Sequence, residues 1–135
     1  MADATYKKKL EKLIIDEGEL SEVLIDRLRK FIRLTRNGEV VFVIPKDQLP
    51  VKAQVLLYLA GKKIARELEL TKTDTAGIEE IAIALAADYF TVAGRLNELK
   101  NQRLVFAVER GSYTVQLSML REILDIVEKM QKTVE

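Results

Sequence analysis

Apolar residues recur at helical spacing along most of the chain, and this pattern predicts a mostly helical protein. The helices are expected at residues 7–15, 20–32, 55–68, 78–85, 89–100 and 117–134. Runs of β-branched and aromatic residues interrupt the helical pattern and predict strands at residues 32–35, 40–44, 103–108 and 113–116. The pattern therefore indicates an α+β fold, mostly helical, with two β-hairpins.

The first hairpin closes at Asn37 and Gly38, a pair that supplies the two positive φ angles of a type I′ turn. Residues 40–44 are apolar on both faces, so we expect helices to cover this strand on both sides. Residues 1–50 are thus expected to form a helix and hairpin extension. Gly61 interrupts the long helix that follows. Glycine inside a helix costs about 1 kcal/mol relative to alanine, so a kink or a close contact is expected there.

A tight break separates the helices of residues 78–85 and 89–100, and a hairpin with its tip at residues 109–112 follows them. Ala86 and Ala87 occupy the break, and Asp88 is a strong N-cap residue for the second helix. This order over residues 51–116 resembles the winged helix-turn-helix domains of small archaeal and bacterial transcription regulators. The resemblance implies that the second helix enters the major groove of DNA. It also implies that the hairpin, the wing, lies along the backbone or the minor groove.

Carried onto this sequence, the resemblance places mostly polar side chains at the DNA. Asn97 and Asn101 would pair with adenine, and Arg95 with guanine or a phosphate. Arg110, at the tip of the wing, would probe the groove. The residues expected at the DNA are Tyr89, Phe90, Thr91, Gly94, Arg95, Asn97, Lys100, Asn101, Arg110, Ser112 and Tyr113. The resemblance therefore predicts a protein that binds double-stranded DNA without catalysis, as a transcriptional regulator or chromosome-associated factor.

The charges of this half of the chain leave a second interpretation open. Residues 77–115 contain four basic and five acidic side chains, a net charge of −1. DNA affinity depends on neutralising phosphates, whereas a neutral outward face suits a winged-helix module that binds a protein partner in a larger assembly. Basic side chains cluster elsewhere, at residues 7–9, 27–36 and 62–66. Strong DNA binding therefore requires these clusters to lie on the same side as the second helix of the motif.

The C-terminal segment, residues 117–135, has apolar residues at alternating spacings of three and four. This seam lasts only about two heptads, fewer than a free-standing coiled coil usually requires. It packs either on the chain's own core or on a second copy. We expect a homodimer, because a symmetric pair doubles the small number of basic side chains that can contact DNA phosphates. The residues expected at its interface are Leu120, Ile123, Val127 and Met130.

Composition narrows the function classes. With 135 residues, 48% of them hydrophobic and 32% charged, the chain has the size and balance of one soluble globular domain. No apolar run approaches the roughly 20 residues that span a bilayer, and residues 1–12 lack the apolar segment of a secretory signal. We therefore expect no membrane association and a cytoplasmic location. The chain has no Cys and no His, so thiol and Ser-His-Asp catalysis and ordinary zinc sites are excluded, and no cofactor is expected.

Overall fold

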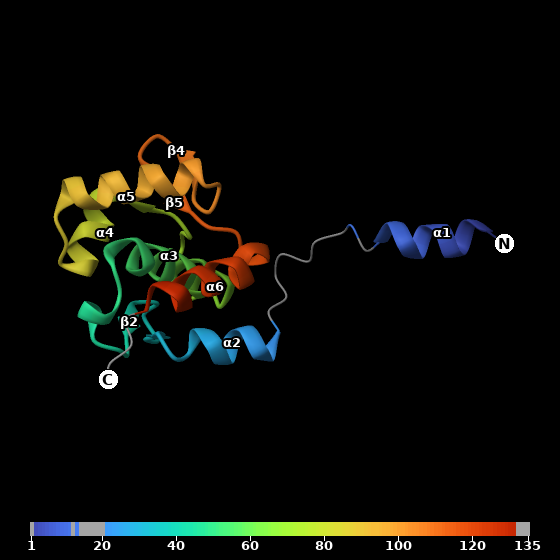
Figure 1. Ribbon diagram of the computed structural model, residues 1–135, viewed down its shortest axis with the longest axis horizontal. Helices are drawn as coiled ribbons and strands as arrows, with labels where there is room; N and C mark the ends of the chain where they lie inside the picture. Colours follow the sequence, from blue (N-terminus) through green and yellow to red (C-terminus); the bar gives the residue numbers. More distant parts are fainter. Residues whose placement is uncertain (1, 12, 14–20, 132–135) are drawn as a thin grey trace.

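The computed structural model describes residues 2–11, 13 and 21–131. It is an α+β structure with about 57% helix and small antiparallel sheets, which confirms the predicted fold class. Helix α3, Val51–Glu67, runs through the centre of residues 21–131 (Figure 1). None of the helices in the described ranges is both long and apolar enough to cross a lipid bilayer.

Helices α4, Ile78–Leu85, and α5, Tyr89–Asn101, pack against one side of α3, and α5 is the uppermost helix in Figure 1. Their bounds agree with the predicted ranges to within one residue. The two helices bury the apolar residues that the helical spacing places inward, namely Ile81, Ala82 and Leu85 in α4 and Val92, Leu96 and Leu99 in α5. Both helices are therefore fixed to α3 through one apolar face, and their opposite faces remain in solvent.

The turn between α4 and α5 is made without glycine. Ala86 takes the left-handed conformation, with φ +52°, and the N–H of Ala87 donates to the carbonyl of Ala82 at 2.9 Å. Asp88 then caps α5, as predicted, because its carboxylate accepts a hydrogen bond from the backbone N–H of Thr91 at 3.1 Å. Only three residues, 86–88, thus separate the end of α4 from the start of α5.

A three-stranded antiparallel sheet in the order β3-β5-β4 accompanies these helices. Strands β4, Phe106–Glu109, and β5, Ser112–Thr114, form the predicted second hairpin, which turns at Gly111 with φ +82°. Strand β3, Ala76–Gly77, was not predicted, because two residues carry no alternation of apolar and polar positions. It pairs with β5 and so joins the segment before α4 to the hairpin.

The N-terminal part contains helix α1, Ala2–Glu11, helix α2, Glu22–Leu28, and a hairpin of strands β1, Ile32–Leu34, and β2, Val40–Phe42. A short 3-10 helix, η1, Lys46–Gln48, precedes α3. The hairpin packs on α3 at Gly61, where an added Cβ would lie 2.8 Å from Cγ2 of Val40. This confirms the predicted close contact. Helix α1 lies apart from the rest of the chain (Figure 1). Residues 12, 14, 15, 20 and 132–134, which the predicted helices include, lie outside the described residues.

Two predictions for the first hairpin are wrong. Asn37 has no positive φ, so the turn is not type I′; instead Gly38, at φ +82°, closes a loop in which its N–H donates to the carbonyl of Thr35 at 2.9 Å. This is the three-residue hairpin loop that ends on a left-handed glycine. Strand β2 is also not covered on both faces, because Val41 and Val43 are 44% and 45% exposed. Only the face toward α3 is covered.

Helix α6, Leu120–Met130, follows a 3-10 turn, η2, Leu117–Met119, and packs on α2 and α3. Its seam residues Leu120, Ile123 and Val127 are 1%, 0% and 0% exposed within this single chain. Side chains without free surface cannot contact a second copy, so the dimer interface predicted at these residues is wrong. The seam belongs to the chain's own core, where Met130 is half-buried at its end. A homodimer formed elsewhere on the surface stays a prediction.

Candidate nucleic-acid interface

The outward face of α5, the second helix of the predicted helix-turn-helix, is exposed to solvent along its length. Phe90 is 79% exposed, although aromatic residues at a helix start are more often buried. The predicted α5 residues that the structure leaves exposed are Tyr89, Phe90, Thr91, Gly94, Arg95, Asn97, Lys100 and Asn101. The structure therefore brings the whole predicted set on this helix to the surface.

The middle of this face is flat. A Cβ added to Gly94 would meet no atom within 4 Å, so no other part of the described chain approaches it. Asn97 and Asn101 follow at helical spacing and form no side-chain hydrogen bond with any described residue. Their amide groups are therefore available to an external donor or acceptor. Gly94 leaves room for a partner's backbone to come close to the helix.

One acidic side chain on α5 is neutralised by two cations. Arg95 forms an ion pair with Glu98 one turn further along, and Nζ of Lys52 lies 3.6 Å from Oε2 of the same carboxylate. Lys52 comes from the first turn of α3, and it lines a cleft of about 380 Å³ together with Thr91 and Arg95. Sequence reasoning missed Lys52, because no local signal links it to α5.

The β4–β5 hairpin lies at the same end of the molecule as α5 (Figure 1). Arg110 is exposed at its tip, as predicted, and forms no ion pair with a described residue. Ser112 and Tyr113 are half-buried, and Tyr113 packs against the core while its backbone pairs with both neighbouring strands. Of the predicted wing residues, Arg110 thus has the freest side chain. Arg103, two residues after the end of α5 and with φ +62°, adds an exposed cation that was not predicted.

The α5 face and its hairpin carry a different net charge from the whole segment of residues 77–115. Residues 88–112 hold four cations and three acids, a balance of +1, and Lys52 raises it to +2. The charge of −1 over residues 77–115 includes Glu79 and Glu80 of α4. Glu80 is already bound by Lys62. The α5 face is therefore weakly positive.

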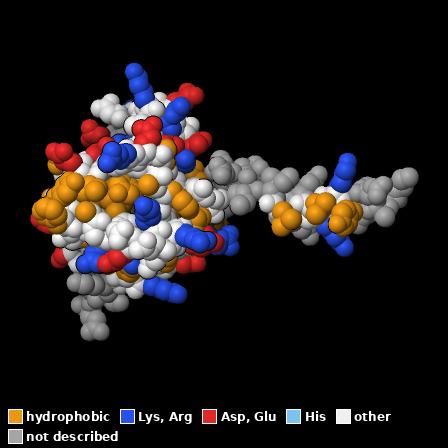
Figure 2. Space-filling view, turned by 90° about the horizontal axis from the view of Figure 1, so that it is seen from above, with side chains coloured by type: hydrophobic (Ala, Val, Ile, Leu, Met, Phe, Trp, Pro, Cys, Tyr) orange, Lys and Arg blue, Asp and Glu red, His pale blue; other side chains and the backbone are white. Residues whose placement is uncertain are grey.

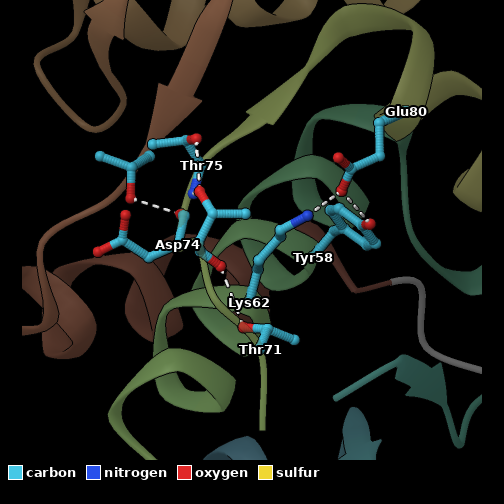
Figure 3. A network of polar contacts seen from close by, with 8 residues as sticks. Tyr58, Lys62, Thr71, Asp74, Thr75 and Glu80 are labelled. Carbon is cyan, nitrogen blue, oxygen red and sulfur yellow. Dashed lines mark hydrogen bonds and ion pairs between the residues drawn. The ribbon is translucent and has the colours of Figure 1, made fainter. Parts of the chain in front are cut away.

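Glu80 is the centre of a polar network between α3 and α4 (Figure 3). The hydroxyl of Tyr58 donates to its carboxylate at 2.7 Å, and Lys62 forms an ion pair with the same oxygen. Burial and the hydrogen bond to Glu80 raise the pKa of the Tyr58 phenol well above its usual range. Nearby, Lys63 forms an ion pair with Asp74 at 2.9 Å. Lys62 thus joins α3 to α4, and Lys63 joins α3 to the loop before β3, so both charges are largely compensated within the chain.

The basic cluster of residues 27–36 does not reach the α5 face. Helix α2, which carries Arg27, packs on α6 and lies below α3 in Figure 1, whereas α5 lies above it. Arg27 donates at 2.7 Å to both Asp125 and Glu128 of α6, and its guanidinium holds the pKa of Glu128 below its usual range. Arg27 therefore serves the α2–α6 contact and does not supply a phosphate contact for DNA binding at α5.

Hydrophobic side chains gather at the start of α5 and beside it on α4. Figure 2 looks onto this side of the molecule and shows a hydrophobic band at its left, where α5 begins in Figure 1. Ile83 is 73% exposed and Tyr89 46%, and the rings of Tyr89 and Phe90 meet edge to face with centroids 5.4 Å apart. We call Ile83, Tyr89 and Phe90 the apolar patch.

No protein-family model, curated protein or solved structure matches the chain.

Proposed function

We propose that residues 51–116 form a winged helix-turn-helix that binds double-stranded DNA without catalysis, as a transcriptional regulator or chromosome-associated factor. The order α3, β3, α4, α5, β4, β5 supports this proposal, as does the sheet order β3-β5-β4. The sharp turn at Ala86 sets α5 at an angle to α4 with a full face in solvent. In such domains the second helix of the pair reads the major groove.

The observation that carries the proposal is the combination of an open polar helix face with a free arginine on a hairpin tip. Asn97 and Asn101 offer paired donors and acceptors of the kind that recognise adenine, and Arg95 suits guanine or a phosphate. Arg110 projects from the hairpin as a groove or backbone contact. Base contacts and backbone contacts, the two components of a specific interface, are thus both available.

The charges limit how strong this binding is. The cations on or beside the α5 face are Lys52, Arg95, Lys100, Arg103 and Arg110, and two of them share Glu98. If three to five phosphates are neutralised, the logarithm of the binding constant falls against the logarithm of salt concentration with a slope of about −3 to −4.5. A homodimer would double this slope, because each copy would bring the same face to DNA.

A titration of fluorescent random-sequence duplex DNA with the full chain tests the proposal. Between about 50 and about 200 mM salt, we expect the affinity of one protomer to fall by a factor on the order of 100. Arg95→Ala should weaken binding at both salt concentrations. An absence of saturable binding at the lower concentration would refute DNA binding by this face.

A second candidate function rests on the apolar patch. Tyr89 and Phe90 are exposed side by side, and Ile83 is exposed on the neighbouring helix. Larger exposed apolar patches mark sites of interaction with a partner. In this alternative, the winged helix packs α5 against another protein of a larger assembly, with Phe90 as the central anchor. The wild-type chain then shows no salt-dependent duplex binding. Sedimentation of wild type against Phe90→Ser tests whether the partner is a second copy, because this change should shift any self-association through the patch toward monomer.

A further inference from the structure

An apolar groove lies on the side of the molecule away from α5, between α2, β1 and the C-terminal end of α3. Its volume is about 350 Å³. Its walls include Ile25, Leu34, Ile64 and Leu68, and two arginines, Arg29 and Arg33, also line it. Among the residues that the structure describes, no acidic side chain lines this groove. A site of this size is at the lower end of the roughly 300–1,000 Å³ typical of small-molecule pockets.

The groove leaves apolar side chains in water. Ile25 is 41% exposed and Leu68 60%, although both are next to a well-filled core. Covering them with an apolar ligand would remove this surface from water, which is favourable in proportion to the area covered. The walls therefore suit a hydrocarbon chain.

The two arginines give the groove its charge preference. Nη1 of Arg33 donates to the carbonyl of Ile32 at 3.1 Å and also to that of Arg29, so backbone acceptors hold its guanidinium in place. Arg29 is exposed and forms no ion pair with any described residue. A guanidinium is planar, always charged and matched to the geometry of a carboxylate. An apolar cavity with a fixed arginine and a free one has the chemistry of a site for an anionic amphiphile.

We propose that this groove binds a long-chain carboxylate, with the hydrocarbon chain against Ile64 and Leu68 and the carboxylate at Arg29 and Arg33. Helix α1 is a poor alternative occupant, because its consecutive lysines, Lys7 to Lys9, would face the two arginines. The site is separate from the proposed DNA-binding face. A positive or a negative result for ligand binding in the groove therefore leaves the proposal of DNA binding by α5 unaffected.

Isothermal titration of the full chain with dodecanoate, below the concentration at which it forms micelles, tests the assignment. We expect one saturable site per chain. Leu68→Asp and Arg29→Glu should each weaken binding at least tenfold, because the first places a negative charge in the apolar wall and the second removes the carboxylate's partner. Both positions are exposed, so neither change should unfold the protein, which circular dichroism checks.

Matched substitutions elsewhere provide the controls. Val108→Asp changes an apolar side chain of similar exposure on the wing, and Arg36→Glu reverses an exposed arginine outside the groove. Both should bind dodecanoate like wild type. Dodecyltrimethylammonium, which has the same chain and the opposite charge, should bind at least tenfold more weakly.

Four results would overturn the proposal. The first is an absence of saturable dodecanoate binding, and the second is equal binding by the cationic amphiphile. The third is a dimer in sedimentation together with an apparent affinity for dodecanoate that weakens as the protein concentration rises. This result would identify a second copy of the chain as the occupant of the groove. Unchanged binding in Leu68→Asp would likewise place the ligand outside the groove.

Discussion

Gly61 lies inside α3 at the point where the β1–β2 hairpin packs on the helix, and its replacement by alanine tests how tightly the two fit. The new Cβ would lie 2.8 Å from Cγ2 and 3.2 Å from Cγ1 of Val40, and 3.0 Å from Cδ1 of Ile32. Carbon atoms pack best at about 3.5–4.0 Å, so something has to move. The end of Ile32 can rotate. Val40 cannot easily do so, because its side chain is branched at Cβ and its strand is paired with β1 at Leu34.

The magnitude follows from two opposing contributions. Replacing a helical glycine by alanine stabilises the helix by about 1 kcal/mol. Forcing an extra methyl group into a filled space costs about 1–3 kcal/mol. Gly61→Ala should therefore lower the free energy of unfolding by about 1 kcal/mol. Gly94→Ala in α5 is the matched control, because a Cβ there meets nothing within 4 Å, and it should raise the free energy of unfolding by about 0.5–1 kcal/mol.

Urea unfolding followed by circular dichroism measures both variants. The helix contribution is common to them, so the difference between their free energies of unfolding isolates the clash with the hairpin, about 1–3 kcal/mol. If Gly61→Ala proves as stable as Gly94→Ala, the hairpin does not pack on α3 as closely as described. The slope of each unfolding curve should stay unchanged, because neither variant alters the surface exposed on unfolding.

Three further changes test other parts of the fold. Ile123→Ala should cost about 2–5 kcal/mol of stability in the same assay without changing the sedimentation of the folded protein; a change of oligomeric state alone would contradict the core assignment of α6. Ala86→Gly should stabilise the protein by about 0.5–1 kcal/mol, because glycine adopts the left-handed conformation without strain; destabilisation would argue against that geometry. The pKa of Tyr58 is raised in the folded protein, so its neutral hydroxyl contributes to the free energy of unfolding. This contribution is fully present below the ordinary tyrosine pKa and declines as the pH rises above that value. Tyr58→Phe should therefore flatten the alkaline loss of stability measured by denaturation, and an identical pH profile would contradict the contact with Glu80.

Helices α4 and α5 could be predicted because their signals are local. A cap residue at Asp88 and apolar residues three and four apart define α5 within a single stretch of sequence. Strand β3 carries no such signal, since Ala76 and Gly77 become a strand only through pairing with β5. The hairpin turn at Gly38 was misassigned because Asn-Gly suits more than one turn, and the neighbouring backbone decides between them.

The candidate site depends on tertiary arrangement, which local pattern does not determine. The seam of α6 has the same spacing whether it meets its own core or a second copy, and only packing against α2 and α3 distinguishes the two. Arg27 of α2 is likewise paired with Asp125 and Glu128 of α6, about 100 positions away in the sequence, so no local pattern reveals that its charge is taken up. Lys52, in contrast, joins the α5 face from a distant part of the chain.

The two hairpins offer the most direct test of DNA binding by α5 and its wing. Arg110 and Arg36 are both exposed arginines at glycine-containing hairpin tips, and only Arg110 belongs to the proposed interface. In the duplex titration, Arg110→Ala should weaken binding and reduce the salt slope by about 1, whereas Arg36→Ala should bind like wild type. Equal weakening by both variants, or no effect of Arg110→Ala on a wild type that does bind, would contradict the assignment of this face.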